Sequence, residues 1–394
     1  MSQDIRDFVT PSCDLLALGE PTHQEPAFAR VRNELFAQLV DQGFRSIALE
    51  TDRVPALAVD AHVQEGAGDF DEVMSEGIAF GRGELAPNRQ LITWMREYNR
   101  TRPPAERLAF HGIDAEMENM SAPSPRRYLE HARAYLAREA GPVSPLALAS
   151  DSAVDIASLA GDDERWSRTE AVMDPAMSLG ATAEAETLRC LADDLLTEFH
   201  ARAPELIAAT SRAQWFRAKA HLTAGLGLLR YHRQLAQPVE ESTRISRLLA
   251  TRDALMVENI LDIRTLEAGR GPTLVFAHNV HLQRSRSHMR MRDDLDLHWY
   301  GAGAVLGPLV GERYAFIAGS LGRSEALGLT DPAPDTYEAA LQRRTTTSWS
   351  LIPAPEPASA RTRTHPSAQQ SRYFPLDEVT LDGADGVLHL NADD

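Results

Sequence analysis

Four short apolar runs, each ended or followed by ionisable side chains, set the pattern of this chain. The runs cover residues 14–18, 45–49, 108–113 and 273–277, and the ionisable residues beside them are Glu20, His23, Glu50, His111, Asp114, His278 and His281. Apolar runs of this length, bounded by glycine or polar residues, are typical of strands buried on both faces. The pattern therefore predicts buried strands that carry reactive side chains near their carboxyl ends.

The segment after the first run has the period of a helix. Apolar residues at positions 28, 31, 35 and 39 fall on one helical face, Pro26 suits the first turn and Gly43 suits the end. Strands that alternate with helices indicate a mostly parallel sheet with helices on its faces. Apolar runs at residues 314–318 and 386–390 are expected to complete this sheet.

The middle of the chain has longer helical patterns. Residues 128–139, 188–200, 213–235 and 244–266 all show apolar spacings of three and four. We therefore expect an α/β fold with a mostly parallel central sheet flanked by helices and an inserted all-helical lobe. In this division residues 1–120 and 269–394 form the α/β core, and residues 121–268 form a helical lobe that covers the active-site cleft. Residues 353–371, rich in Pro, Ala, Ser and Thr, are expected to form an exposed loop.

Charge and cysteine content narrow the choice of partners. The 394 residues carry a formal net charge of −17, which disfavours broad attraction to nucleic acid or to an anionic membrane. Cys13 and Cys190 are the two cysteines, so neither a disulfide framework nor a CxxC metal site is expected. The chain has neither a signal-peptide pattern nor a long uncharged apolar run. We expect a cytoplasmic protein with a small-molecule substrate, and the oligomeric state stays open.

The ionisable residues at the strand ends are expected to meet in one crevice. Side chains that follow parallel strands converge at the carboxyl edge of an open α/β sheet, where ligands bind. Taken singly, His111 could be an ordinary loop histidine, and Glu50 could cap a helix. Arg32 lies on the margin of the apolar face of its helix, where it could bind an anion or extend its stem towards water.

Two chemistries fit a cluster of carboxylates, histidines and an arginine. One is activation of water by a histidine base whose tautomer is set by a carboxylate. The other is metal binding, because Glu20-x-x-His23 has the spacing of carboxylate–histidine metal pairs, although those pairs lie on helices. The chain has no G-x-S-x-G, H-E-x-x-H or G-x-x-x-x-G-K-[ST] motif.

The motifs of the chain resemble those of the erythromycin esterase family. Residues 19–23 are similar to its G-E-x-T-H segment, residues 47–50 to its second strand, which ends in glutamate, and residues 111–114 to its H-G-x-D segment. Residues 252–259 resemble its R-D-x-x-M-x-x-N helix, and residues 277–281 its A-H-N-x-H strand end. The motifs occur in the family's order over about residues 12–320.

The resemblance implies a metal-independent hydrolase without a cofactor. In this reading His23 is the general base that activates water, and Glu20 is its carboxylate neighbour. Arg32 corresponds to the family's essential arginine, and Glu50 and His278 complete the catalytic set. We hypothesise direct attack of water on an ester or lactone, with Arg32 or protonated His278 stabilising the oxyanion.

Substrate contacts are expected from a second group of residues: His281, Asn279, His111, Asp114 and Trp215. Trp166, Phe216 and Tyr231 could line an apolar pocket with Trp215 for a macrolide, a polyketide or another natural product, or they could simply pack helices. The chain departs from the family at Gln24 and Val280, where small residues are usual. Two alternatives stay open: a tailoring enzyme that uses the same site for acyl transfer, cyclisation or elimination, and a metal- or haem-binding protein.

Overall fold

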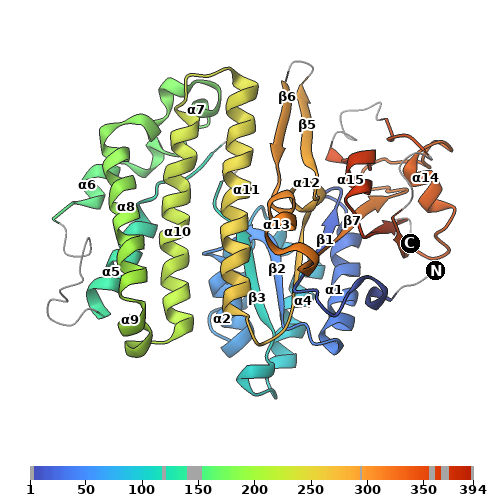
Figure 1. The fold of residues 1–394 in the computed structure, drawn as a ribbon, viewed down its shortest axis with the longest axis horizontal. Helices are drawn as coiled ribbons and strands as arrows, with labels where there is room; N and C mark the ends of the chain where they lie inside the picture. The colour runs from blue at the N-terminus through green and yellow to red at the C-terminus, as the bar shows by residue number, and fades with distance from the viewer. Residues whose placement is uncertain are drawn as a thin grey trace.

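A mostly parallel sheet forms the centre of the molecule. The computed structural model describes residues 4–117, 121–139, 153–292, 295–354, 360–364 and 372–391. Its seven-stranded sheet has the order β3-β2-β4-β1-β7-β9-β8, and every neighbouring pair is parallel except β8 with β9 (Figure 1). The strands are β1 Leu15–Glu20, β2 Ser46–Asp52, β3 Ala109–Asp114, β4 Thr273–His278, β7 Tyr314–Leu321, β8 Trp349–Pro353 and β9 Gly386–Leu390. The predicted fold class is confirmed.

Helices cover both faces of this sheet. Successive side chains of a strand point to opposite faces, and the strands are apolar throughout, so both faces must be buried. Leu16 and Leu18 of β1 face a core that includes side chains of α1 Pro26–Asp41, α2 Ala56–Glu65, α3 Phe70–Gly77 and α4 Ala86–Asn99. Leu15 and Ala17 face the opposite core, with side chains of α11 Glu241–Leu266 and α13 Ala302–Val310. The remaining helices beside the sheet are α12 Asn279–Leu282, α14 Tyr337–Gln342 and α15 Glu378–Asp382.

The helical lobe has an apolar core of its own. Its helices are α5 Arg126–Glu139, α6 Ile156–Ala160, α7 Glu170–Met173, α8 Ala183–Ala201, α9 Ala203–Ala209 and α10 Arg212–Leu235, on the left of Figure 1. Helix α11 lies between this lobe and the sheet, and its residues Met256, Ile260 and Ile263 belong to the core on the sheet. No helix in the described part of the chain has both the length and the apolar character needed to cross a bilayer.

Three regions differ from the sequence-based expectation. Strand β8, Trp349–Pro353, was not predicted, and it pairs antiparallel to β9 at the edge of the sheet. An unpredicted antiparallel hairpin, β5 Arg286–Arg292 with β6 Leu295–Tyr300, extends beyond the sheet (Figure 1). In the expected exposed loop, residues 355–359 and 365–371 lie outside the described residues. Within 360–364, however, Arg363 is buried and donates to the carbonyls of Gly322 and Thr330, at 2.8 and 2.6 Å. The prediction of exposure is wrong for Arg363, whose long side chain reaches these carbonyls, while Arg361 and Thr364 are exposed as expected.

Position 19 requires a glycine, because the side chain of Asn279 passes over β1 at this residue. The Asn279 amide donates to the carbonyl of Gly319 on β7 at 2.8 Å, and its oxygen accepts from the Gly319 N–H at 2.9 Å. A Cβ at Gly19 would overlap Asn279 Oδ1. This amide therefore fastens the end of β4 to β7 across a strand that must have no side chain at that point.

We predict that Gly19→Ala lowers the free energy of unfolding by about 1–3 kcal/mol, because the added methyl must displace the Asn279 bridge. Urea denaturation measures the change. Gly307→Ala in α13 is the matched control, since its methyl would lie at an ordinary 3.7 Å from Arg284. An unchanged urea midpoint for Gly19→Ala would contradict the account of this crossing.

Candidate active site

The carboxyl ends of four strands meet around one buried carboxylate. Glu20 ends β1, Asp114 ends β3 and His278 ends β4, while Glu50 lies near the end of β2. Glu20 and His278 are aligned partners in the pairing of β1 with β4. The predicted convergence of these strand ends follows directly from the parallel sheet, and Glu50 lies at its centre.

Both carboxylate oxygens of Glu50 lie close to hydrogen-bond donors or cationic side chains. Its Oε2 accepts the backbone N–H of His278 at 2.8 Å. Its Oε1 lies 3.3 Å from Arg252 Nη2, 3.4 Å from His23 Nε2 and 3.6 Å from His281 Nε2. Although burial opposes ionisation, the positive charges of His23 and His281 hold the pKa of Glu50 well below its ordinary value. Glu50 is therefore a permanent anion shared by three cationic side chains.

His23 lies between two carboxylates at the mouth of the site. Its Nδ1 is 2.7 Å from Glu20 Oε1, while its Nε2 faces Glu50, and 35% of its side chain remains exposed. Burial disfavours the imidazolium, but Glu50 and Glu20 together raise the pKa of His23 to about 9. Glu20, the nearer partner, fixes the proton on Nδ1 and leaves Nε2 as the nitrogen that can exchange a proton.

An arginine and an aspartate on α11 complete the charge network. Arg252 donates through Nε to Asp114 Oδ1 at 3.1 Å and to Asp114 Oδ2 at 3.0 Å, and its Nη2 also contacts Asp114. Asp253 accepts from the indole N–H of Trp299 at 2.7 Å and lies 2.8 Å from His281 Nδ1. Although burial acts in the opposite direction, the carboxylates of Asp253 and Glu50 raise the pKa of His281. Asp114 thus holds Arg252 against Glu50, while Asp253 orients His281.

Arg252 and Asp253 were not predicted as site residues. The pair belongs to the helical motif that carried the family resemblance, and that motif was the available signal. Charged neighbours on a helix usually face solvent, and nothing local in the sequence showed that this turn of α11 faces the strand ends. The structure joins the two elements through Asn259, which donates to the carbonyl of Ile113 at 2.9 Å.

His278 is a neutral histidine in this site. Its Nδ1 accepts the N–H of Val280 at 3.3 Å as the cap of α12, so the ring carries its proton on Nε2. Burial, with the charge of His23 added to it, lowers the pKa of His278 to about 3. The structure therefore disfavours the protonated His278 of the hypothesis, because the ring is buried and lies 5.4 Å from the ring of His23, which carries the positive charge. Its neutral N–H can still donate a hydrogen bond.

Two arginines line a small cleft beside His23. Arg32 is buried, donates to Asn88 at 2.9 Å and lies over the ring of Phe276, 5.0 Å from its centroid. Burial lowers its pKa to about 10, so it stays charged at neutral pH.

Arg82 was not predicted, and it lies in a glycine-rich stretch without helical or strand periodicity. It donates to the carbonyl of Glu50, and its Nη1 is 3.4 Å from His23 Nδ1. The cleft has room for about 30 Å³ of water, which is enough for a molecule or two.

Three residues that were expected to bind substrate instead form hydrogen bonds within the protein. His111 lies inside β3, where its Nε2 is 2.9 Å from Glu267 and its Nδ1 is 3.1 Å from Arg53. Asn279 uses its whole amide to bridge Gly319. Trp215 is buried in the core of the helical lobe and donates its indole N–H to the carbonyl of Phe199 at 3.2 Å. The expectation that these three bind substrate is not supported, because each is already occupied by protein groups.

A larger apolar pocket is lined in part by Arg252. Its volume is about 290 Å³, and Tyr231, one of the predicted aromatic candidates, contributes to its wall. The other candidates, Trp166 and Phe216, belong to the core of the lobe. The remaining lining residues are Met117, Val172, Met173, Glu241, Ile245, Leu248, Leu249, Arg252, Met289, Met291 and Leu295. Arg252, which contacts Glu50 of the polar cleft, thus also borders the apolar pocket.

The fold and this site together define an α/β protein with a histidine–carboxylate centre at the carboxyl ends of its strands. The sequence matches the family model for erythromycin esterase over residues 39–391, so the chain belongs to the erythromycin esterase family. The resemblance is confirmed, and membership indicates a hydrolase of the esterase type. The matched span begins within α1, so residues 19–23 lie outside it, and the role of His23 depends on its geometry.

Solved structures share the fold along nearly the whole chain. A protein from Bacillus cereus gives a TM-score of 0.67 at 17% identity, covering 99% of this chain and 92% of that one. A mutant of the erythromycin esterase EreC in its open conformation gives 0.64 at 18%, covering 96% and 90%. A succinoglycan biosynthesis protein gives 0.60 at 15%, covering 97% and 88%. Identities this low support the fold alone. The comparison with curated proteins gives no match.

We predict that NMR titration of ¹³Cε1-labelled histidines gives His23 a pKa of about 9, and that Glu50→Gln moves it towards the ordinary value of 6.5. Loss of the negative charge at Nε2 removes the largest contribution that favours the imidazolium. The raised pKa also stabilises the folded chain below about pH 6.5, and this contribution disappears as pH rises through 9.

Glu267→Gln is the matched control, because it removes a buried carboxylate that bonds His111 rather than His23. This control is expected to leave the His23 titration unchanged. Equal titration midpoints in wild type and Glu50→Gln would show that Glu50 does not set the proton affinity of His23.

Proposed function

We propose that this protein hydrolyses an ester or lactone by direct attack of water, with His23 as the general base. The observation that carries the proposal is the position of His23, held by Glu20 through Nδ1 at 2.7 Å and bordering a cleft large enough for water. A base held by a carboxylate takes a proton through its other nitrogen, and such groups contribute roughly 10²–10⁴-fold in rate.

Glu20 and Glu50 have different parts in this mechanism. Glu20 orients the imidazole, because it accepts from the nitrogen that does not take part in proton transfer. Glu50 stabilises the imidazolium that forms when His23 takes a proton from water, and the imidazolium returns this proton to the leaving alkoxide when the acyl C–O bond breaks. Since a pKa of about 9 leaves roughly one His23 in a hundred neutral at pH 7, we expect activity to rise with pH up to about 9.

Arg32 is the proposed partner of the developing oxyanion. It stays charged, lines the same cleft as Glu20 and His23, and its position is fixed by Asn88 and Phe276. A pre-oriented guanidinium in a partly buried site stabilises developing negative charge without rearrangement. His278 can add a neutral N–H donor, because its Nδ1 accepts from Val280 and its proton is therefore on Nε2.

A metal-independent reaction also fits the way His23 is held. A histidine binds an ion through one nitrogen at a time, whereas His23 presents Nδ1 to Glu20 and Nε2 to Glu50. The two carboxylates therefore do not converge on a common imidazole nitrogen. Removal of metal by chelation is expected to leave turnover unchanged.

The family and the two cavities support a proposal for the substrate class. We propose a natural-product ester or lactone, such as a macrolide or polyketide. Its apolar part is expected in the pocket of about 290 Å³ that Arg252 borders, and its carbonyl enters through the exposed side of His23. Gln24 and Val280, which replace small residues of the family pattern, lie near this entrance in sequence and are expected to affect substrate choice.

Mass spectrometry separates hydrolysis, which adds one water to the substrate, from cyclisation or elimination.

We predict that His23→Ala lowers kcat/KM by about 10²–10⁴-fold on an ester found by mass-spectrometric screening of lactones and esters. Its far-UV circular dichroism should match that of the wild type, because His23 is partly exposed. His62→Ala on α2 is the control and should keep full turnover. Near wild-type turnover by folded His23→Ala would rule out this base.

A further inference from the structure

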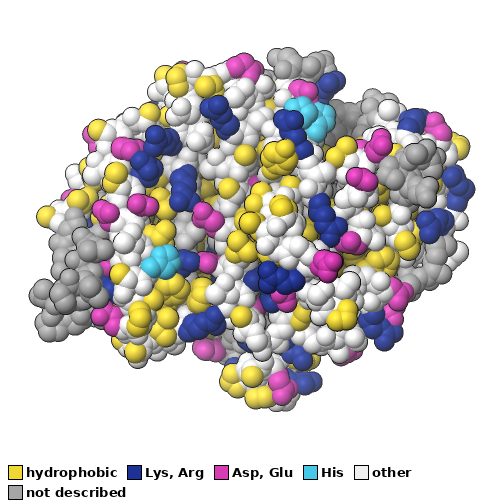
Figure 2. Space-filling model, viewed as in Figure 1, with side chains coloured by type: hydrophobic (Ala, Val, Ile, Leu, Met, Phe, Trp, Pro, Cys, Tyr) yellow, Lys and Arg dark blue, Asp and Glu magenta, His cyan; other side chains and the backbone are white. Residues whose placement is uncertain are grey.

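The β5–β6 hairpin presents histidine and aspartate on its outer face. Buried and exposed residues alternate along β6, so Leu295 and Leu297 point inward while Asp296 and His298 point outward. His288 on β5 is the direct cross-strand partner of His298. Histidine side chains are visible over the hairpin in the space-filling view (Figure 2).

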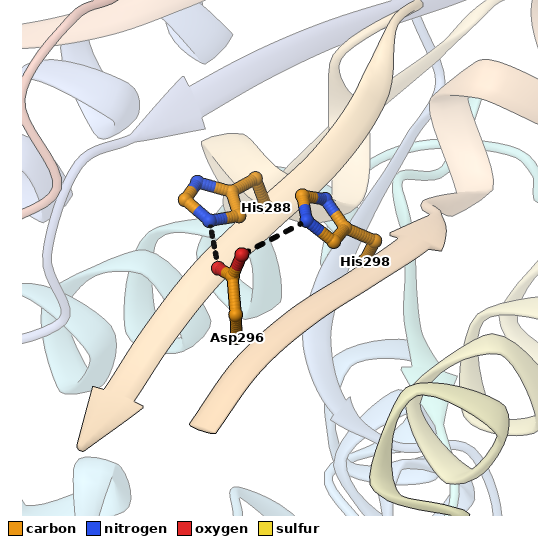
Figure 3. A group of neighbouring side chains, drawn as sticks. All are labelled: His288, Asp296 and His298. Atoms are coloured by element: carbon orange, nitrogen blue, oxygen red, sulfur yellow. Dashed lines mark hydrogen bonds and ion pairs between the residues drawn. The ribbon is translucent and has the colours of Figure 1, made fainter. Parts of the chain in front are cut away.

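The three outward side chains already point towards one another (Figure 3). His298 Nε2 is 3.3 Å from Asp296 Oδ2, and His288 Nε2 contacts the other oxygen, Oδ1. The two imidazole rings are stacked, with centroids 4.6 Å apart. His298 donates its backbone N–H to Ser246 of α11 at 3.1 Å, so it does not form a ladder bond to His288. Side chains are closest at such non-hydrogen-bonded pairs.

We propose that His288, Asp296 and His298 bind a divalent transition-metal ion of the zinc type. Their ligand atoms lie within 4.8 Å of one another, and no other group of three such residues in the described part of the chain meets this condition. Bonds of about 2.0–2.1 Å place tetrahedral zinc ligands roughly 3.3 Å apart, so small rotations of the side chains suffice. Two imidazoles and one carboxylate suit Zn²⁺, Ni²⁺ or Co²⁺ better than Mg²⁺ or Ca²⁺, which prefer oxygen.

Exposure of the three residues favours access and leaves coordination positions for water. The exposed fractions of the side chains are 48% for His288, 50% for Asp296 and 40% for His298. Three protein ligands with water in the remaining positions make an open site.

Metal binding on this face would fix a wall of the apolar pocket. Met289 and Met291 on β5 and Leu295 on β6 line that pocket from the inner side of the same hairpin. An ion that joins the two strands on the outside limits the separation of these residues on the inside. Metal binding would therefore hold this wall of the pocket in one position, at a distance from the histidine–carboxylate centre.

Isothermal titration of tag-free protein with ZnCl₂ alone tests the site, with MgCl₂ as the hard-cation comparison. We expect one Zn²⁺ per chain in wild type, and at least about tenfold weaker binding in His288→Gln, His298→Asn and Asp296→Asn, because each removes a ligand. These residues are exposed, so the variants should stay folded, and circular dichroism checks this. Zn²⁺ should also slow amide hydrogen exchange in residues 286–300 of the wild type.

Two matched variants exclude the other histidine clusters. His131→Ala removes one ring of the stacked His131–His221 pair on the helical lobe, and His23→Ala removes the histidine of the active site. Both should bind Zn²⁺ as tightly as wild type. The proposal is overturned if wild type binds no stoichiometric Zn²⁺, if the hairpin variants keep full affinity, or if binding is lost in His131→Ala or His23→Ala instead.

Discussion

The buried charge of Glu50 is the constraint on which the rest of the site depends. An isolated carboxylate in a protein interior costs several kcal/mol, so it persists only where donors and cations surround it. Glu50 receives the backbone N–H of His278 and the nearby charges of Arg252, His23 and His281. These partners come from β4, α11, α12 and the loop after β1, so the carboxylate joins segments far apart in the sequence.

The same charge determines the proton chemistry of the histidines. His23 and His281 lie near Glu50, and each has a second carboxylate at Nδ1, so both have raised pKa values. His278 has only the backbone N–H of Val280 at Nδ1, and its pKa falls to about 3. Neighbouring imidazoles thus take opposite protonation states, because each has a different partner on its second nitrogen.

Local sequence patterns were sufficient for six of the seven strands of the sheet, all except β8, and for the residues at their ends. Buried parallel strands have a short, continuous apolar signal, and parallel pairing brings their carboxyl ends together, which is why Glu20, Glu50 and His278 could be placed. His111 was misassigned because its position inside β3 turns it towards Glu267 at the end of α11. The alternation of residues 295–300 was a readable strand signal for the missed hairpin.

Features that depend on long-range docking could not be read in this way. Arg252 and Asp253 enter the site because α11 packs across the sheet, and Arg82 enters through a turn without a regular pattern. His278 is neutral in a buried position where its Nδ1 accepts from the backbone N–H of Val280. His23 is protonated because it lies between the carboxylates of Glu20 and Glu50. Such choices are set by contacts between elements, which a single sequence does not specify.

Single-turnover hydrolysis in ¹⁸O-labelled water, with enzyme in excess over an identified ester, tests the central claim most directly. Attack by a water molecule that His23 activates predicts one ¹⁸O atom in the acid formed during the first turnover. An unlabelled acid would mean that a protein oxygen is the nucleophile. That result would contradict direct attack of water and the role of His23 derived from its contacts with Glu20 and Glu50.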